Sequence, residues 1–417
     1  MAPALLDIND CNLVLWHGDQ RVQSPGYALH RDSRYLFGNE ARAAARLQPR
    51  NVNTRYWWHL STEPLQPELG TARHSADLAH AHLQALHAEG GDAEEVIFSV
   101  PASMQREQLA LLLGIARACP FSAVGLVNRS VLLGSLHARE AQLWHLELQL
   151  HQSLLTRVGA DETTVSLQEH IALPGHGLLQ LQEKIVEIVA REFVRQTRFD
   201  PRRSAASEQT LYDALPAALR SLQTSTETNV EIDGYRARIA RSDLVKASEG
   251  LRRSIEETAN GSPAPMIADP LAALLPGFVD ALTGARIIDQ DDLHNAMSSQ
   301  LEHLVQRAAN LHYITALPRL ESNAAASASP IDPVAQSPGR AAATHLLNGH
   351  SAMTLANANS LLPDGCALRH EKDGWRLAVQ GASASVNGER VDSETSLIAG
   401  DQLEIAGHGY TVISVQD

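Results

Sequence analysis

His145 and Glu147 stand two positions apart in a stretch of strict alternation between apolar and polar residues, from Leu143 to Leu150. The alternation predicts a β-strand, on which both side chains point to the same side and form a polar pair. A histidine beside a carboxylate is suited to proton transfer in catalysis. The same pair also suits a solvated strand face, and we favour a surface pair over a catalytic one.

A second group of potential ligands lies on a helix predicted from about His74 to His87 and ended by Gly90 and Gly91. Its four histidines stand at positions 74, 80, 82 and 87. Only those at 80 and 87 share a face, two turns apart, which is too few ligands for a zinc site. We therefore expect a histidine-decorated face in solvent and no bound metal.

The three cysteines, Cys11, Cys119 and Cys366, have neither an even count nor metal-type spacing. They predict free, buried thiols rather than disulfides or a zinc site. The run of arginines at positions 191, 195, 198, 202 and 203 is a possible phosphate-binding patch. We favour instead cations placed near the end of a helix and in the loop after it.

Length, composition and charge limit the number of domains, the class of partner and the cellular location. The chain has 417 residues, enough for two or three domains, with 44% hydrophobic and 20% charged residues. A formal charge of −14 argues against nucleic acid as the main partner. The longest apolar run, Leu109 to Ala116, is too short to span a bilayer, and the N-terminus lacks a signal-peptide pattern. We expect a cytoplasmic protein without direct membrane insertion.

The segment from Glu95 to Ser130 must form the central scaffold, because it reads as a complete strand, helix and strand unit. Val96 to Val100 is an apolar strand closed by Pro101, and Ser103 is the expected N-cap of the following helix. A second strand follows from Phe121 to Val127. This order predicts parallel pairing with a right-handed crossover.

The sequence VIFSVPAS, then a helix, then VGLVNRS, resembles the seventy-kilodalton heat-shock chaperones of the actin-like ATPase superfamily. The resemblance covers residues 1 to about 320 and implies an α/β actin-like fold with two lobes built from ribonuclease H-like halves. In that family a Glu and a Pro follow the Asn, and the Glu helps to hold the magnesium–phosphate group. Here Arg129 and Ser130 stand in their places.

The family's phosphate-binding motifs are also altered. A hairpin predicted over residues 4 to 16 resembles the first phosphate loop, with Asp7 on the family's Asp, but Asn9 and Asp10 replace its Gly and first Thr. An added carboxylate at Asp10 would repel phosphate. The second phosphate loop would fall near Leu146 to Gln149, where glycine is absent. A backbone without glycine there is poorly suited to curl around a phosphate.

The remaining contacts to the nucleotide are degenerate in the same way. No lysine ends the segment before Trp57 and Trp58, for which we favour packing in the core. Positions that would surround the adenine and ribose hold Pro216, Leu219, Arg220 and Gln223, and Pro216 is expected to disturb its helix. The family's adenosine-admitting glycines are replaced where Met266 to Ala268 runs into Asp269 and Pro270. The resemblance therefore implies a pseudo-ATPase domain.

The last quarter of the chain changes character. Residues 271 to 317 predict helices, the last with an apolar face of Leu301, Leu304, Ala308 and Leu311, and residues 321–343 read as a flexible Ala/Ser/Pro linker. Residues 344–417 predict a small all-β sandwich that resembles a forkhead-associated (FHA-like) domain. The family's phosphothreonine readers, near 355–357, 363–365 and 382–384, are missing, and Arg369 and His370 are expected along a strand.

Three functions remain open at this point. We favour a non-enzymatic scaffold or adaptor that binds protein partners through both domains, with no catalytic, metal or cofactor-binding residues. Degenerate folds of both kinds recur in bacterial secretion and pilus platforms, so the resemblance suggests such an apparatus. One alternative is a divergent nucleotide-binding ATPase regulator in which Asp7, Arg129 and Arg220 survive and Arg129 faces phosphate. The other is an adaptor that reads phosphothreonine through residues 344–417.

Overall fold

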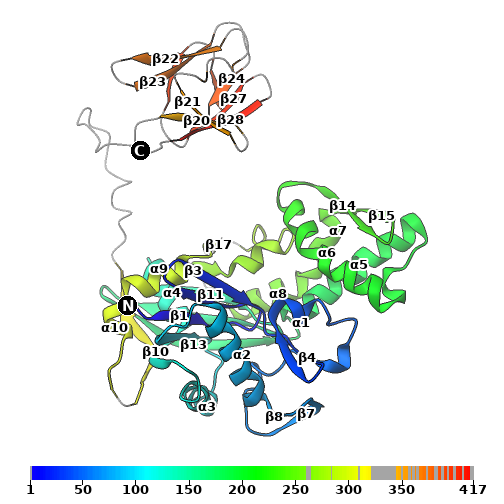
Figure 1. Cartoon of the computed structure of the whole chain (residues 1–417), viewed down its shortest axis with the longest axis vertical. Coiled ribbons are helices and arrows are strands. Elements are labelled where there is room, and N and C mark those ends of the chain that lie inside the picture. The colour runs from blue at the N-terminus through cyan, green and yellow to red at the C-terminus, as the bar shows by residue number, and fades with distance from the viewer. Residues whose placement is uncertain are drawn as a thin grey trace. The chain divides into compact units, whose positions relative to one another are not determined.

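The structure, a computed structural model, divides the chain into two compact units, Met1–Ala324 and Ala325–Asp417 (Figure 1). The first is described at residues 2–259, 264–282, 284–308 and 310–320. The second is described at residues 344–348, 351–355, 358, 362, 366–371, 374–379, 384–386, 389–391, 394–397, 401–405 and 408–413. The predicted linker at 321–343 lies outside the described residues.

The first unit is mixed α/β and contains two six-stranded sheets. In the first sheet the strands lie in the order β18-β10-β9-β1-β2-β3. Their bounds are β1 (Ala4–Asp7), β2 (Leu13–His17), β3 (Gln20–Ser24), β9 (Glu95–Val100), β10 (Ser122–Asn128) and β18 (Tyr313–Ile314). Strands β1 to β3 are antiparallel, and β1, β9, β10 and β18 are parallel. The predicted parallel pairing of the two strands within Glu95 to Ser130 is confirmed.

The second sheet follows the same plan, in the order β17-β16-β11-β12-β13-β19. Its bounds are β11 (Gln142–Leu148), β12 (Gln152–Ala160), β13 (Thr164–Pro174), β16 (Met266–Ala268), β17 (Ala285–Ile287) and β19 (Ala316–Pro318). Again the first three strands along the chain form an antiparallel meander, and the later β16 and β17 add in parallel beside the first of them. The two halves thus repeat one topology over five strands, whereas β18 is added beside β10 in the first sheet and β19 beside β13 in the second.

Helices α4 (Arg129–His137) and α9 (Asp292–Ser299) lie between the two sheets in one apolar core. Leu132 and Leu133 of α4 pack there against residues of both sheets, among them Leu5 and Val158. On its other face the first sheet is covered by α2 (Ser75–Glu89) and α3 (Arg106–Ala116). Gln105, not Ser103, is the N-cap of α3, and its N–H donates to Gln108 Oε1 at 2.9 Å.

The far face of the second sheet carries a helical layer whose main element is α5 (Leu178–Thr197). Leu181, Ile185, Val189 and Phe193 recur every four residues and form its buried stripe. The rest of this layer is α6 (Ala205–Thr224), β14 (Glu227–Ile232), β15 (Tyr235–Ala240), α7 (Arg241–Leu244) and α8 (Glu249–Thr258). Pro216 lies inside α6 without ending it, so the expected disturbance is absent at the level of the helix boundaries.

The described residues of the first unit also form smaller elements. They are β4 (Ala28–Arg31), β5 (Arg34–Phe37), α1 (Gly38–Arg42), β6 (Val52–Asn53), β7 (Pro64–Leu69), β8 (Ala72–His74), α10 (Leu301–Leu304) and four 3-10 turns at Pro49–Asn51, Pro201–Arg203, Val245–Ala247 and Pro270–Leu274. The helices predicted for residues 271 to 317 are wrong at β17, which pairs with β16, and the last of them is wrong beyond α10. The helix does not continue because residues after 312 form β18 and β19, which add to the edges of the first and the second sheet.

The second unit is β-rich in its described part. One sheet has the order β21-β20-β28-β27-β24-β25 and the other β22-β23-β26. The bounds are β20 (His345–Asn348), β21 (Ser351–Thr354), β22 (Cys366–Glu371), β23 (Gly374–Val379), β24 (Ala384–Val386), β25 (Glu389–Val391), β26 (Glu394–Leu397), β27 (Gln402–Ile405) and β28 (His408–Ile413). Arg369 and His370 lie exposed on β22, as predicted. The positions expected for the other phosphothreonine readers lie mostly outside the described residues.

Candidate functional site

Four strands of the two sheets bring charged residues to one place between the halves of the first unit. Asp7 is the last residue of β1, and Arg129 directly follows β10. From the second sheet, Glu147 lies near the end of β11, and Asp269 directly follows β16. The carboxyl ends of parallel strands are where α/β folds place their ligand sites. This position is therefore the candidate site.

Arg129 is the centre of the cluster. Its Nε lies 3.0 Å from each of the two carboxylate oxygens of Asp7. Its Nη1 donates to Asp269 Oδ1 at 2.8 Å and lies 3.5 Å from Glu147 Oε2. The four residues are 0 to 6% exposed, so the guanidinium joins three carboxyl groups from both sheets in a region without bulk water.

Neutral polar groups complete the shell around these charges. Ser99 Oγ donates to Asp7 Oδ1 at 3.0 Å, and Asn9 Nδ2 donates to Asp269 Oδ2 at 3.3 Å. His145 Nε2 lies 3.3 Å from both Arg129 Nη1, a donor, and Asp269 Oδ1, an acceptor. On the other side of the ring, Nδ1 lies 2.8 Å from Ser130 Oγ.

Burial and the Arg129 charge compete to set the protonation of the cluster. Burial raises the pKa of Glu147 to about 8 against the opposing effect of Arg129, so this acid is mostly protonated at neutral pH. Burial also raises the pKa of Asp7. At Asp269 burial acts in the same sense, but Arg129 and His145 outweigh it and hold the pKa below its ordinary value. Burial lowers the pKa of His145, which favours the neutral ring.

The prediction that His145 and Glu147 form a surface pair is wrong, because both side chains are 0% exposed. Their strand, β11, has neighbours on both edges, and the face that carries them looks toward Arg129 rather than toward solvent. The alternation in the sequence marks two different faces of a strand. It does not say whether the polar face meets water or other buried polar groups.

Beside the Arg129 cluster, the turn between β1 and β2 contacts the turn between β11 and β12. Asp10, in the first turn, accepts a hydrogen bond from the backbone N–H of Leu150, in the second, at 2.7 Å. In the glycine-free second turn, the carbonyls of Gln149 and Leu150 accept from the N–H groups of Leu178 and Leu179 at 2.8 and 3.1 Å. Backbone N–H groups at the start of a helix bind phosphate in other proteins. Here those of Leu178 and Leu179 already donate to the carbonyls of the turn.

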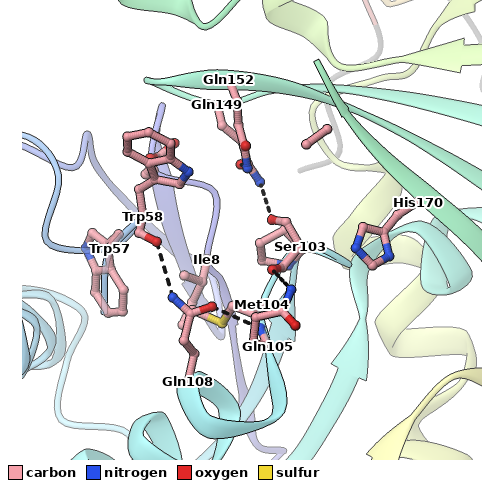
Figure 2. A pocket seen from close by; sticks show the side chains of 13 residues that line it. Ile8, Trp57, Trp58, Ser103, Met104, Gln105, Gln108, Gln149, Gln152 and His170 are labelled. Atoms are coloured by element: carbon pink, nitrogen blue, oxygen red, sulfur yellow. Dashed lines mark hydrogen bonds between the residues drawn. The ribbon is translucent and has the colours of Figure 1, made fainter. Parts of the chain in front are cut away.

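A cavity of about 340 Å³ opens next to these turns (Figure 2). It is lined by Ile8, Asp10, Trp57, Trp58, Pro101, Ser103, Met104, Gln105, Gln108, Gln149, Gln152, His170 and Ala172. Trp57 is buried, as predicted, whereas Trp58 is only partly covered and faces this cavity. No local pattern in the sequence distinguishes the four glutamines of this cavity from surface glutamines.

The other sequence candidates lie elsewhere. The structure brings Asp7 and Arg129 together, but Arg220 is exposed on α6 and belongs neither to this cluster nor to the cavity. Gln223 lines a separate cavity of about 190 Å³. Cys11 is buried, as expected, whereas Cys119 and Cys366 are only partly buried; all three thiols are free.

The predicted solvent-exposed face of histidines on α2 is wrong for two of its members. His82 is fully buried and contacts Ser24 Oγ at 2.7 Å, Tyr56 Oη at 2.8 Å and Trp57 Nε1 at 3.1 Å. His87 is 5% exposed and contacts the carbonyl of Ala93. Within the described residues, no three His, Cys, Asp or Glu side chains are grouped so that they could hold a metal ion.

No protein-family model matches this chain, and no curated protein matches it at a significant level. None of the helices in the described part of the chain is both long and apolar enough to cross a membrane.

Proposed function

We propose that residues 1–320 are a degenerate actin-like domain of the heat-shock chaperone type and that the protein is a non-enzymatic scaffold or adaptor in a cytoplasmic assembly. The order of five strands that the two sheets share supports this proposal, because the resemblance implies two halves of one topology. In this proposal the second unit is an FHA-like sandwich that contributes a second surface for protein partners.

The observation that carries the proposal is the position of Arg129. In the family that this chain resembles, a Glu in the place of Arg129 helps to hold a magnesium–phosphate group. Here a side chain supplies the positive charge, since Arg129 contacts Asp7, Asp269 and Glu147 from within the fold. A metal ion would have to displace a buried cation that already makes charge-assisted hydrogen bonds to the acids.

The same geometry argues against the alternative in which Arg129 faces phosphate. Its side chain is 7% exposed, and its Nε and Nη1 groups are directed at carboxylates. An incoming phosphate would also meet Asp10 and the carbonyl-capped start of α5. We therefore infer that neither ATP hydrolysis nor nucleotide-driven switching is the activity of this domain.

Calorimetric titration of the full chain with magnesium-ATP, together with a thermal-shift scan over a nucleotide panel, tests the proposal. We expect no heat of binding and no change in melting temperature, because a ligand of the folded state would raise it. A Kd tighter than about 100 μM, roughly 5.5 kcal/mol, would overturn the pseudo-ATPase assignment. Asp7→Asn and Arg129→Met would then be the first variants to titrate.

A further inference from the structure

The cavity beside the Arg129 cluster, lined by the residues given above, has a chemical character of its own. Among the described residues that line it, only Asp10 and His170 are ionisable, and none is an arginine or a lysine. Burial raises the pKa of Asp10 to about 7, so even this acid carries only part of a charge at neutral pH. The cavity therefore suits an uncharged ligand and opposes a polyanion.

Four of its lining residues are glutamines, at positions 105, 108, 149 and 152, and they come from two different segments of the chain. Gln149 and Gln152, on the β11–β12 turn, are 4% and 7% exposed, and Gln152 Nε2 donates to Gln149 Oε1 at 2.8 Å. On the opposite wall Gln108 Nε2 donates to the carbonyl of Trp58 at 3.2 Å. A carboxamide both donates and accepts hydrogen bonds, which matches the alternating N–H and C=O groups of a polypeptide backbone.

An apolar contact surface lies between these amides. In Figure 2, Trp57 and Trp58 stand on one side of the cavity and Ser103 and His170 on the other. The ring of His151 stacks on Trp58 with 5.0 Å between centroids and 12° between planes, which fixes the indole in place. A partly exposed, immobilised indole is a typical anchor for an apolar side chain of a partner.

The polar wall is also held rigid from behind. Gln149 Nε2 donates to Glu147 Oε1 at 2.7 Å, and through this acid the wall connects to Arg129. The same Nε2 lies 3.4 Å from Ser103 Oγ, so the Gln149 side of the cavity is linked to the segment that leads into α3. A surface preorganised in this way loses little entropy when a ligand binds.

We propose that this cavity binds a short uncharged segment of a protein partner, whose peptide groups pair with the glutamine carboxamides and one of whose apolar side chains packs on Trp58. The inference rests on the proposed scaffold function and identifies the place and the chemistry of one partner contact. The cavity volume of about 340 Å³ suits a short peptide segment rather than the surface of a folded domain.

The test uses the purified full chain and a positional-scanning library of N-acetylated, C-amidated hexapeptides. Binding of each pool is measured by biolayer interferometry, and the best peptide is then titrated by calorimetry. We expect uncharged pools with one fixed apolar residue to bind, and Trp58→Ala and Gln152→Leu each to weaken the best peptide at least tenfold. Gln223→Leu, which alters a glutamine in the separate cavity, should leave the affinity unchanged.

Each other outcome has a definite meaning. A folded protein that binds neither peptide nor nucleotide would overturn this inference and leave the pseudo-ATPase assignment standing, whereas tight binding of ATP would overturn both. Peptide affinity that survives both cavity substitutions, or a preference for charged pools, would also overturn it. Both Trp58→Ala and Gln152→Leu are tested. If one of them does not unfold cooperatively, the peptide affinity of the other decides.

Discussion

The guanidinium of Arg129 lies 3.0 Å from both carboxylate oxygens of Asp7, although the two residues are 122 positions apart and belong to different strand ends. Both side chains are buried, so the ion pair is not screened by water. Buried pairs of this kind contribute little compared with a well-packed apolar replacement of both partners. Removal of one partner is costly because the other charge stays behind unpaired.

Arg129→Met should therefore destabilise the first unit strongly, because it leaves Asp7 and Asp269 without their cation. We expect a loss of about 3–5 kcal/mol in the free energy of unfolding, measured by urea denaturation. The control is Arg191→Met, which removes an exposed partner of Glu187 on α5 and should cost about 1 kcal/mol or less. Equal losses in the two variants would show that the Arg129 cluster is not the buried ion network described above.

Glu147→Gln tests the protonation of the cluster. The pKa of Glu147 is raised from 4.5 to about 8, so the folded state holds a proton that the unfolded chain releases in this interval. This contribution to stability is fully present below pH 4.5 and is lost as the pH rises toward 8. The wild type should consequently lose stability relative to Glu147→Gln across this window.

Urea denaturation of both proteins at several pH values measures that difference, in which the other titrating groups cancel. Glu249→Gln, at an exposed position on α8, is the control for the substitution itself. A difference between wild type and Glu147→Gln that stays constant with pH would contradict a protonated Glu147.

His82 gives the opposite pH dependence. Burial lowers its pKa from 6.5 to about 3, so the folded state keeps the ring neutral while the unfolded chain binds a proton. Its contribution to stability is present above pH 6.5 and is lost as the pH falls toward 3. His82→Asn should cost about 1–3 kcal/mol at pH 7, because Tyr56 and Trp57 lose a buried hydrogen-bonding partner. The deficit should shrink on acidification, and the exposed His303→Asn should show neither effect.

Local patterns account for much of the scaffold but for little of the site. The strand, helix and strand unit around Val96 was predictable because apolar spacing and Pro101 act over a few residues. The sequence also drew attention to Asp7 and Arg129 separately, through departures from a family pattern. Their contact was not predictable, because it depends on how two sheets meet. The burial of His145 was not predictable for the same reason, since its partner Arg129 reaches it from the other sheet.

Gly177, just before α5, packs closely against the backbone of the glycine-free turn at Gln149 to His151. No sequence motif indicates this contact. A Cβ on Gly177 would lie 2.4 Å from the carbonyl carbon of His151 and 2.5 Å from the nitrogen of Gln152, both backbone atoms. The turn is held there by the hydrogen bonds from the start of α5, so it cannot move away without breaking them.

Gly177→Ala should accordingly destabilise the protein by about 1–3 kcal/mol through overpacking, as measured by thermal and urea denaturation. It should also weaken the binding of any ligand in the neighbouring cavity, because Gln149 lies in the displaced turn and Gln152 directly follows it. Gly114→Ala is the matched control, since this exposed glycine of α3 has no atom within 4 Å of an added Cβ. In a helix the control change should stabilise by about 0.5–1 kcal/mol. Stabilisation by both substitutions would mean that α5 does not pack against this turn.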